Sequence, residues 1–251
     1  MSRRKFLGLG ALALPAALGA DAGLVEPTFL RVTEVKVNAR GSMRIAHFSD
    51  FHYKGDEKYG ARVIAQINRL APDFACFTGD LVEDAKFAPG ALDFIRQIKA
   101  PVYGAPGNHD YWCHAPFSEY ESAFAATGGE WLVDRAVTVP ERDLEIVGLA
   151  ADSWRIVGEP KAARRLLLMH YPAQADTFGE QHFDLILAGH SHGGQVRLPL
   201  YGPLILPWGV GRYDHGYFDS PAGPMYVNAG IGTYYLPFRF NCRPEITLLT
   251  L

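Results

Sequence analysis

The sequence has few cysteines, and they lie too far apart to staple a fold. Cys76, Cys113 and Cys242 are the three cysteines of the 251-residue chain, and they form neither a Cys-x-x-Cys pair nor an even-numbered framework. Disulfide-rich scaffolds and zinc ribbons need paired or closely spaced cysteines. This scarcity argues against both, so we expect the fold to rest on a hydrophobic core.

The chain also lacks a surplus of positive charge. It has 24 Lys and Arg residues against 27 Asp and Glu residues, a formal net charge of −3. Duplex nucleic acid is bound through several Lys and Arg contacts to phosphate, and the sequence has no basic cluster for that purpose. We therefore expect no nucleic acid partner, and a nuclease is disfavoured.

Internal repeats, low-complexity segments and breaks in composition are missing as well. Hydrophobic residues make up 48% of the sequence, which is enough for a sizeable core. We therefore predict one domain over residues 24–251, preceded by a separate segment over residues 1–23.

The N-terminal segment has an apolar stretch too short to span a bilayer. Residues 6–20 are uncharged but interrupted by Pro15, whereas a spanning helix needs about 20 apolar residues. Paired Arg3 and Arg4 precede this stretch, and Ala20-Asp21-Ala22 follows as a plausible cleavage point. The segment resembles a twin-arginine export signal, which would place the protein in the periplasm or cell envelope. An uncleaved membrane anchor and an ordinary helix with a basic start are the alternatives.

Hydrophobic periodicity predicts strands and helices that alternate in the first half of the chain and mainly strands in the second. This order indicates parallel strands with crossover helices and a further sheet packed on the first. The predicted strands cover residues 29–37, 43–48, 74–78, 102–105, 136–139, 144–149, 166–169, 185–188 and 245–251, and the predicted helices cover residues 59–70, 89–98 and 117–126.

Residues 196–217 form a long stretch rich in Pro, Gly and large apolar side chains. It is too rich in Pro and Gly for a regular helix and too apolar for a disordered segment. Long loops inside compact domains are often functional. Two interpretations remain open: a flap that covers the core, or a hydrophobic lip, centred on residues 198–208, that meets a substrate or a membrane.

Metal-competent side chains follow directly on five of the predicted strands. The carboxyl ends of strands in α/β sheets are where ligands bind, so these side chains should meet at one place. A single histidine would more often be structural, but five strand ends with the same property make that explanation improbable. The residues are Asp50, His52, Asp80, Asn108, His109, His170, His190 and His192.

The side-chain types at these positions favour divalent transition metals. They offer carboxylate and amide oxygens and imidazole nitrogens but no thiolate, which suits Mn, Fe or Zn better than a structural zinc site. Two cations about 3.5–4 Å apart need a ligand that touches both, and a carboxylate can do this. We therefore expect two divalent metal ions.

The ordered motifs resemble the signature of the calcineurin-like metallophosphoesterases. The resemblance spans residues 50–192 and extends, more loosely, to an exported cell-envelope branch through Gly193-Gly194-Gln195-Val196 and residues 240–246. It implies a four-layer αββα sandwich with two mixed sheets. The motifs that carry it are Asp50-Phe51-His52, Gly79-Asp80, Gly107-Asn108-His109-Asp110, His170 and Gly189-His190-Ser191-His192.

The resemblance also implies a role for each residue. Asp50, His52 and His192 would hold the first metal, and Asn108, His170 and His190 the second. Asp80 would bridge them, with a bridging hydroxide as the nucleophile.

Two further residues complete the catalytic set that the resemblance implies. His109 would protonate or stabilise the leaving oxygen. Glu83 stands where the family often has an Asp that orients this histidine, so Asp84 or Asp110 could serve instead.

The resemblance makes the chain an enzyme that hydrolyses phosphate esters or pyrophosphates. The leading specific substrate is UDP-2,3-diacylglucosamine of lipid A synthesis, an acylated molecule that would suit the apolar stretch and membrane contact. Export argues against it, because that reaction belongs on the cytoplasmic side. A general envelope phosphodiesterase is the alternative, and an inactive metal-binding scaffold is the alternative of another class.

Phosphate contacts are less well defined by the sequence. No Arg follows Asp80 closely, which argues against a phosphoprotein phosphatase. Any one of Arg155, Arg197, Arg212 and Arg239 could meet phosphate, although an ordinary surface role is the simpler expectation for each.

Overall fold

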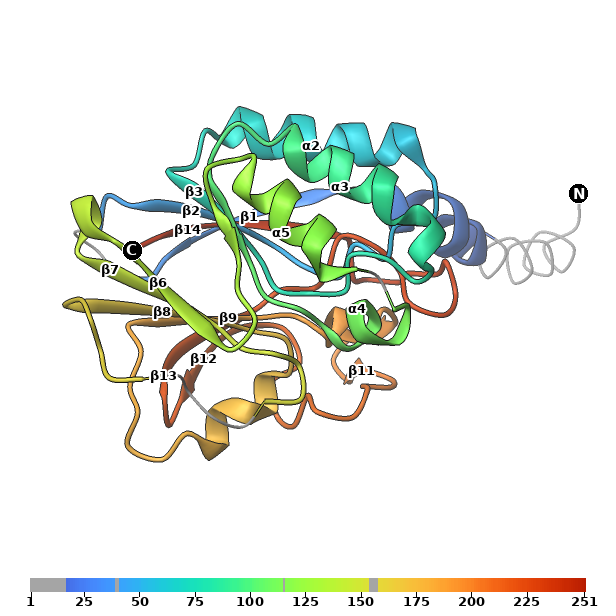
Figure 1. Cartoon of the computed structure of the whole chain (residues 1–251). Helices are drawn as coiled ribbons and strands as arrows, with labels where there is room; N and C mark the ends of the chain where they lie inside the picture. The colour runs from blue at the N-terminus through green and yellow to red at the C-terminus, as the bar shows by residue number, and fades with distance from the viewer. Residues whose placement is uncertain (1–16, 39–40, 115, 154–157) are drawn as a thin grey trace, which may run out of the picture.

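The computed structural model describes residues 17–38, 41–114, 116–153 and 158–251 (Figure 1). The predicted twin-arginine motif and Arg155 lie outside this described part. Within it, no helix combines the length and the apolar character needed to cross a bilayer.

The first large sheet has six strands in the order β1-β14-β2-β3-β4-β5. Strands β2 to β5 are parallel to one another, and β14 joins β2 in antiparallel register with Thr247 opposite His47. The edge position predicted for the first strand is confirmed, because within the described residues β1 pairs only with β14. The strands are β1 (Arg31–Lys36), β14 (Glu245–Thr250), β2 (Arg44–Phe48), β3 (Phe74–Phe77), β4 (Val102–Gly104) and β5 (Glu130–Trp131).

The second large sheet also has six strands, in the order β12-β13-β9-β8-β7-β6. Its four central strands are parallel, and an antiparallel strand closes each edge. The strands are β12 (Gly216–Ser220), β13 (Gly223–Val227), β9 (Leu185–Ala188), β8 (Arg164–Met169), β7 (Leu144–Gly148) and β6 (Arg135–Val139). The predicted pair of mixed sheets is confirmed.

Three α-helices cover the outer face of the first sheet: α2 (Glu57–Leu70), α3 (Ala88–Arg96) and α5 (Phe117–Ala125) (Figure 1). Helix α2 begins where the Asp56 carboxylate accepts a hydrogen bond from the Tyr59 amide, an N-cap. It buries Val63, Ile64 and Ile67, whose spacing puts them on one face. The helices and the sheet thereby share one apolar layer.

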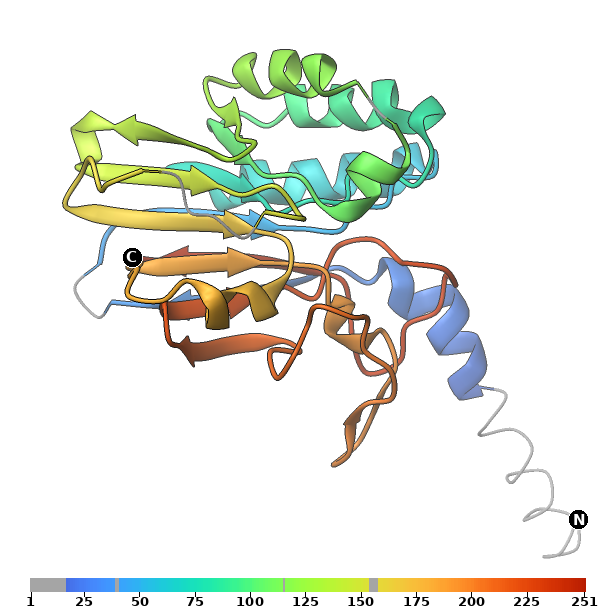
Figure 2. The ribbon, with the colours of Figure 1, turned by 60° about the horizontal axis from the view of Figure 1, so that its bottom comes forward.

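A second apolar layer lies between the two sheets. Alternate residues of β2 and β14, such as Ile45 and Leu249, pack there against Leu166, Leu168 and Leu187 of the second sheet. All are fully buried. The two sheets are therefore fixed face to face, as Figure 2 shows from the side.

The outer face of the second sheet has a thinner cover than the expected layer of helices. Among the described residues it is covered by a 3₁₀-helix, η5 (Pro172–Thr177), and by loops that contribute Phe178 and Tyr213. The αββα arrangement is thus confirmed, with short 3₁₀ structure as its fourth layer. Among the described residues, the connection from β8 to β9 forms η5 in place of an α-helix, and residues 189–215, between β9 and β12, are rich in Gly and Pro.

The described start of the chain packs on the loop before β14. Residues 17–20 are α-helical and continue into a π-helix, η1 (Asp21–Val25), and a 3₁₀-helix, η2 (Glu26–Thr28). Ala22 is 1% exposed, and the Glu26 carboxylate accepts hydrogen bonds from the amides of Asn241 and Cys242. This segment and the small hairpin of β10 (Arg197–Leu198) and β11 (Gly202–Pro203) project from the same end of the molecule in both views.

Candidate metal centre

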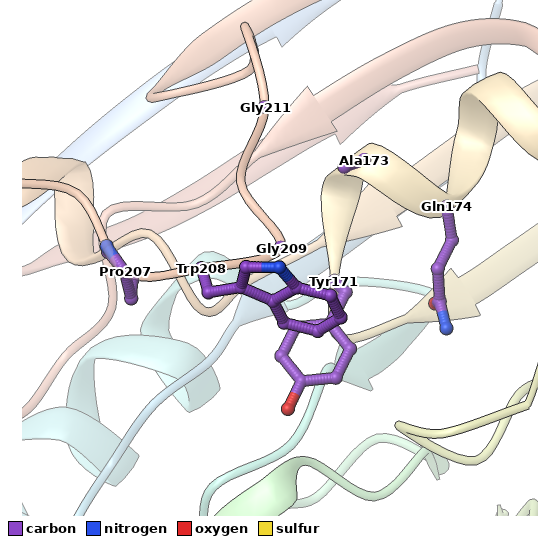
Figure 3. A pocket seen from close by; sticks show the side chains of 7 residues that line it. All are labelled: Tyr171, Ala173, Gln174, Pro207, Trp208, Gly209 and Gly211. Carbon is purple, nitrogen blue, oxygen red and sulfur yellow. The ribbon is translucent and has the colours of Figure 1, made fainter.

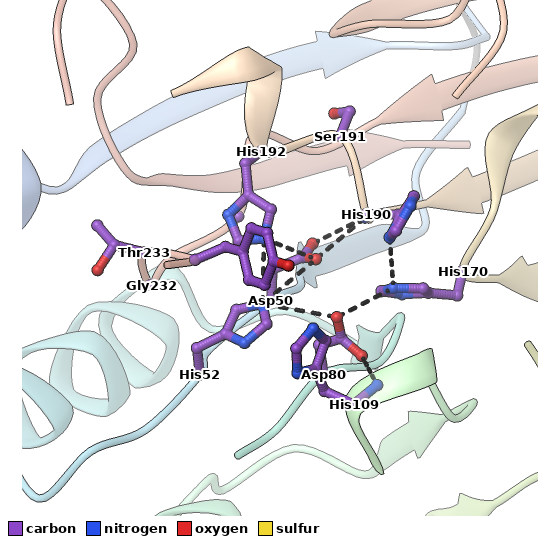
Figure 4. Close-up of polar contacts among 12 residues, drawn as sticks. Asp50, His52, Asp80, His109, His170, His190, Ser191, His192, Gly232 and Thr233 are labelled. Atoms are coloured by element: carbon purple, nitrogen blue, oxygen red, sulfur yellow. Dashed lines mark hydrogen bonds and ion pairs between the residues drawn. The ribbon is translucent and has the colours of Figure 1, made fainter. Parts of the chain in front are cut away.

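The predicted strand ends do meet, at the edge where both sheets present their carboxyl ends (Figure 4). Strands β2, β3 and β4 of the first sheet deliver Asp50, His52, Asp80, Asn108 and His109, and β8 and β9 of the second sheet deliver His170, His190 and His192. Asp80 lies between the two groups: one carboxylate oxygen, Oδ2, is 3.5 Å from His52 Nε2 and 3.2 Å from His170 Nε2.

Three sets of donor atoms are close enough to share a cation. One of them, His52, Asp80 and His109, lies wholly on the first sheet, and the other two join the sheets. Asp50, His52 and His192 form one set, and Asp80, His170 and His190 another, with the atoms of each set within 4.8 Å of one another. In the first set His52 Nε2 is 3.0 Å from His192 Nε2, and in the second His190 Nδ1 is 3.1 Å from His170 Nε2. The two sets that join the sheets resemble the two groups of ligands that the sequence predicts, with Asp80 in the place of Asn108.

Asn108 supplies the test of whether these residues fit metal ions. Its side-chain oxygen is buried yet has no hydrogen-bond partner among the described residues. It lines the same cavity as Asp80 and His190. A buried carbonyl oxygen without a partner is costly unless something else satisfies it. The carboxylate, imidazole and amide donors here suit a divalent transition metal.

Backbone carbonyls orient two of the imidazoles. His170 Nδ1 is 2.7 Å from the Thr78 carbonyl oxygen, and His190 Nε2 is 2.7 Å from the Trp208 carbonyl oxygen. Each of these ring nitrogens donates its proton to that oxygen, so in the neutral ring the other nitrogen carries a lone pair directed at the cluster. Both rings are therefore held in the tautomer that a metal ligand needs.

Glu83 contacts two histidines of the site at once. Its Oε1 is 2.8 Å from His52 Nδ1, and its Oε2 is 3.2 Å from His109 Nδ1. The two alternatives considered from the sequence have other partners: Asp84 is half exposed beside Lys86, and Asp110 accepts hydrogen bonds from the amides of Asp80, Leu81 and Gly107. Of these three acids, Glu83 is the one that reaches His109.

The charges of the cluster shift one another strongly. Burial alone would raise the pKa of Asp80, but the His170 and His52 imidazoles outweigh burial and hold its pKa below the ordinary range. Burial likewise opposes protonation of His170, yet the Asp80 carboxylate raises the pKa of His170 to about 9. Burial lowers the pKa of His190 to about 3. For His109, burial is outweighed by the contact with Glu83, so its pKa is raised.

Five of the expected ligands have left-handed backbone conformations. Asp50, His52, Asp80, His190 and His192 have φ between 43° and 68°. Non-glycine residues pay a conformational cost there, and such strain gathers at functional sites. The reversal of the chain directly after each strand turns these side chains back over the sheet edge, which is how short turns bring them together.

Two glycines allow the loops after β3 and β4 to touch beneath the cluster. A Cβ on Gly107 would lie 2.1 Å from Asp80 Oδ1, and one on Gly79 would lie 2.3 Å from the Gly107 nitrogen. Any larger residue at either position would therefore push Asp80 away from its place between the two donor sets.

Of the aromatic walls of the site, the sequence indicated Trp208, through the hydrophobic lip offered for residues 198–208, but not Trp112, Tyr171 or Tyr234. The cavity over the cluster, about 380 Å³ in volume, is lined by Trp112, Tyr171, Trp208 and Tyr234 as well as by the predicted residues, and we call it the metal cleft. The Tyr234 ring lies 5.2 Å from the His109 ring and 5.9 Å from the His52 ring. A further cavity lies on the other side of Trp208, between residues 171–174 and 207–211 (Figure 3). Nothing in the sequence marks the rings of Trp112, Tyr171 and Tyr234 as neighbours of the site.

The described arginines do not line the metal cleft. Arg197 pairs with Asp214, and Arg212 lies near Asp176 and Tyr213. The surface role expected for Arg239 is wrong, because this residue is fully buried. Its guanidinium donates to the carbonyl oxygens of residues 229, 230, 232 and 242, and thereby ties the loop after β13 to the loop before β14.

Two mixed sheets with a cluster of metal-competent side chains at their shared edge define a metal-dependent phosphoesterase architecture. The family model for the calcineurin-like phosphoesterases matches residues 43–194. The chain belongs to this family and is therefore a hydrolase of phosphate esters.

Three curated relatives align over nearly the whole chain. The uncharacterized metallophosphoesterase YkuE of Bacillus subtilis is 32% identical, and the alignment covers 100% of this chain and 98% of YkuE. The phosphodiesterase YaeI of Escherichia coli is 30% identical, with 100% and 99% covered. The UDP-2,3-diacylglucosamine pyrophosphatase LpxG of Chlamydia trachomatis is 26% identical, with 95% and 94% covered.

Proposed function

We propose that the protein is a phosphodiesterase that works with two divalent metal ions. The observation that carries this proposal is the position of Asp80, whose Oδ2 lies within 3.5 Å of imidazole nitrogens from both sheets. A carboxylate in that position can serve two cations at once. The relative named as a phosphodiesterase, at 30% identity over the whole chain, supports the same reaction.

The ligand roles follow the two donor sets. The first ion would be held by Asp50, His52 and His192, and the second by Asn108, His170 and His190, with Asp80 between them. Bound divalent ions would neutralise charge on the phosphoryl oxygens and lower the pKa of a water molecule.

His109 has the placement of the acid that protonates the leaving oxygen. Its ring lines the metal cleft and lies outside the two predicted ligand groups, so a proton on its Nε2 would be available to a substrate. Glu83 accepts from His109 Nδ1 and thereby holds the ring in place, and the same carboxylate holds His52. Glu83 acts as a positioning residue for both.

The test is hydrolysis of bis(p-nitrophenyl) phosphate by metal-stripped protein, with Mn, Zn, Fe and Mg added back singly. We expect release of p-nitrophenolate that depends on added metal and saturates as the metal sites fill. Stoichiometric metal binding without hydrolysis would contradict the phosphodiesterase proposal and would favour a metal-binding scaffold or a highly selective pyrophosphatase.

UDP-2,3-diacylglucosamine hydrolysis is the second candidate. The relative of that name and the exposed apolar loop that borders the metal cleft favour it, since Ile205 and Trp208 are 79% and 76% exposed. Release of UMP from this substrate, measured beside the aryl phosphodiester, separates the candidates. A pyrophosphatase would cleave UDP-2,3-diacylglucosamine at least ten times faster than the aryl phosphodiester at equal concentration.

We also propose that the protein is exported to the periplasm or cell envelope through the twin-arginine route. The paired arginines at positions 3 and 4 and the short apolar stretch after them support this proposal. Fractionation of cells that carry the wild-type chain or the Arg3→Lys/Arg4→Lys variant tests it, and an unchanged location of the variant would contradict it.

A further inference from the structure

A second hollow opens directly beside the metal cleft. One wall comes from residues 194–207, including Val196, Leu204 and Ile205, and the other comes from Tyr235 and Leu236. Its volume is about 380 Å³. We call it the apolar groove.

The groove and the metal cleft are continuous. His192, Pro207 and Tyr234 line both. His192 belongs to one of the two donor sets, so the groove begins at a metal ligand. The Tyr234 ring, packed on His52 and His109, forms the partition between the two hollows. A substrate whose phosphate lies at the metal-ligand cluster could therefore extend directly into the groove, without passing over the exterior of the protein.

Hydrogen bonds hold the two walls of the groove together. The Gln195 side chain accepts from the Tyr234 amide at 2.6 Å and donates to the Tyr234 carbonyl at 3.1 Å. The Phe240 amide donates to the Gln195 carbonyl at 2.8 Å, and within the first wall the Leu204 amide donates to the Val196 carbonyl at 3.0 Å. The groove is thus a built feature of the fold rather than a gap between two loose loops.

The lining of the groove is suited to a hydrocarbon. None of the described residues that line it is an Asp, Glu, Lys or Arg. Ile205 and Leu236 remain 79% and 63% exposed although they are large and apolar. Exposed apolar surface gathered in a concave site beside a reaction centre is typical of a ligand pocket. A sugar or a nucleotide would find few polar partners for its hydroxyl groups there.

We propose that the apolar groove binds an alkyl or acyl chain of the substrate, so that the enzyme prefers phosphate diesters or pyrophosphates with one lipid-like substituent. This inference rests on the proposed function and adds the chemical class of one of the two groups on phosphorus. The alkyl or acyl chain of the substrate lies on the His192 and Tyr234 side of the metal-ligand cluster. The other substituent leaves past His109, on the opposite side of the Tyr234 ring.

The experiment compares p-nitrophenyl alkyl phosphates with methyl, butyl and octyl groups, used below their micelle concentrations with the metal-loaded protein. Each fully buried CH₂ is worth about fourfold in binding. For partial burial in an open groove we therefore expect kcat/KM to rise about 100-fold from methyl to octyl. A flat series in the wild type would overturn the proposal.

Leu236→Asp and Ile205→Asp should each lower the octyl-to-methyl ratio of kcat/KM at least tenfold. Leu200→Asp is the matched control, because Leu200 lies in the same loop, is fully exposed and does not line the groove. Its ratio should equal that of the wild type. If the octyl-to-methyl ratio of kcat/KM fell equally in all three variants, the alkyl groups would be binding to the whole apolar surface, as on a membrane-binding face. That result would overturn the groove proposal.

The design also separates failure of the groove from failure of the proposed function. If no ester of the series is hydrolysed with any metal, the phosphodiesterase proposal fails. The groove is then tested by calorimetry with methyl phosphate and octyl phosphate. Octyl phosphate should bind about 100-fold more tightly, and equal affinities would overturn the groove proposal on their own.

Discussion

The two sheets contribute different chemistry to the same site. The first sheet supplies both carboxylates, Asp50 and Asp80, together with His52, Asn108 and His109, whereas the second supplies three imidazoles. The first sheet is backed by three α-helices, and the second by a 3₁₀-helix and loops. The carboxylates that would attract a cation therefore lie on the sheet that is covered by α-helices.

The second sheet depends on the first even for the orientation of its ligands. His170 is fixed by the carbonyl of Thr78, which follows β3 of the first sheet, and the His190 amide donates to the Asp50 carboxylate. Each of the two donor sets that resemble the predicted ligand groups draws on both sheets. The site exists only while the sheets are docked, and the following predictions test that asymmetry.

The largest effect is expected at Asp80, which lies between the donor sets from the two sheets. Asp80→Asn keeps the shape of the side chain but removes the charge that both sets share. We expect a loss of several kcal/mol in transition-state stabilisation, about three powers of ten in kcat/KM, together with loss of bound metal. Kinetics and metal analysis of the purified variant measure both, and full metal content would show that Asp80 does not bridge.

His109→Ala should separate catalysis from metal binding on the first sheet. Loss of a general acid typically costs 10²–10⁴-fold, so we expect a drop of about 10²-fold on an alkyl diester with a poor leaving group. The drop should be much smaller for p-nitrophenolate, which needs no proton to leave, and metal content should stay at the wild-type level. Full activity on the poor leaving group would remove His109 from the mechanism.

Glu83→Gln tests whether one carboxylate supports both a ligand and the acid. Residues that orient a ligand typically contribute 10–100-fold in metal affinity or activity. We therefore expect Glu83→Gln to lower both the metal affinity and the activity about tenfold. Asp84→Asn is the matched control, because Asp84 is the next residue and pairs with Lys86 on the surface. Equal behaviour of the two variants would show that contact with His52 and His109 is not what Glu83 contributes.

A smaller effect, on stability, is expected from a link between the sheets that needs no metal. Glu245 of β14 accepts hydrogen bonds from Tyr226 of the second sheet and from His215. Burial would raise the pKa of Glu245, but His215, Thr33 and Arg31 outweigh it and lower the pKa to about 2. A lowered folded-state pKa gives stability that is present above the unfolded value near 4.5 and is lost as the pH falls toward 2.

The loss should amount to about 2 kcal/mol for the metal-free wild type, followed by urea unfolding between pH 6 and pH 3. Glu245→Gln should flatten this dependence, whereas Glu34→Gln on the exposed side of β1 should leave it unchanged. If the free energy of unfolding of Glu245→Gln depended on pH to the same extent, groups other than Glu245 would be the cause of that dependence.

The sequence predicted the order of strands and helices well where periodicity was regular. It did not predict β12, β13 and β5, because these strands are short or broken by Gly and Pro. It did predict the donor cluster, since the rule that ligands follow parallel strands needs only the strand ends.

What it could not predict are features that exist only after the chain has folded. The left-handed turns at Asp50 and His190 depend on contacts of the whole sheet edge, and the double contact of Glu83 depends on the approach of His109 across another loop. Tyr234 is held at the site by a hydrogen bond from its amide to the side chain of Gln195, which is 39 residues away in the sequence. No local pattern encodes such distances.

The buried position of Ala22 has a consequence for proteolytic maturation. The plausible cut at residues 20–22 lies in a helical stretch, Ala22 is packed beneath the loop that Arg239 organises, and the Ala22 carbonyl accepts the Arg239 amide. A peptidase binds its substrate as an extended strand, so this bond is protected once the segment has docked. Processing at this bond would have to compete in time with docking, and the two orders of events would leave mature proteins that differ in mass at their N-termini.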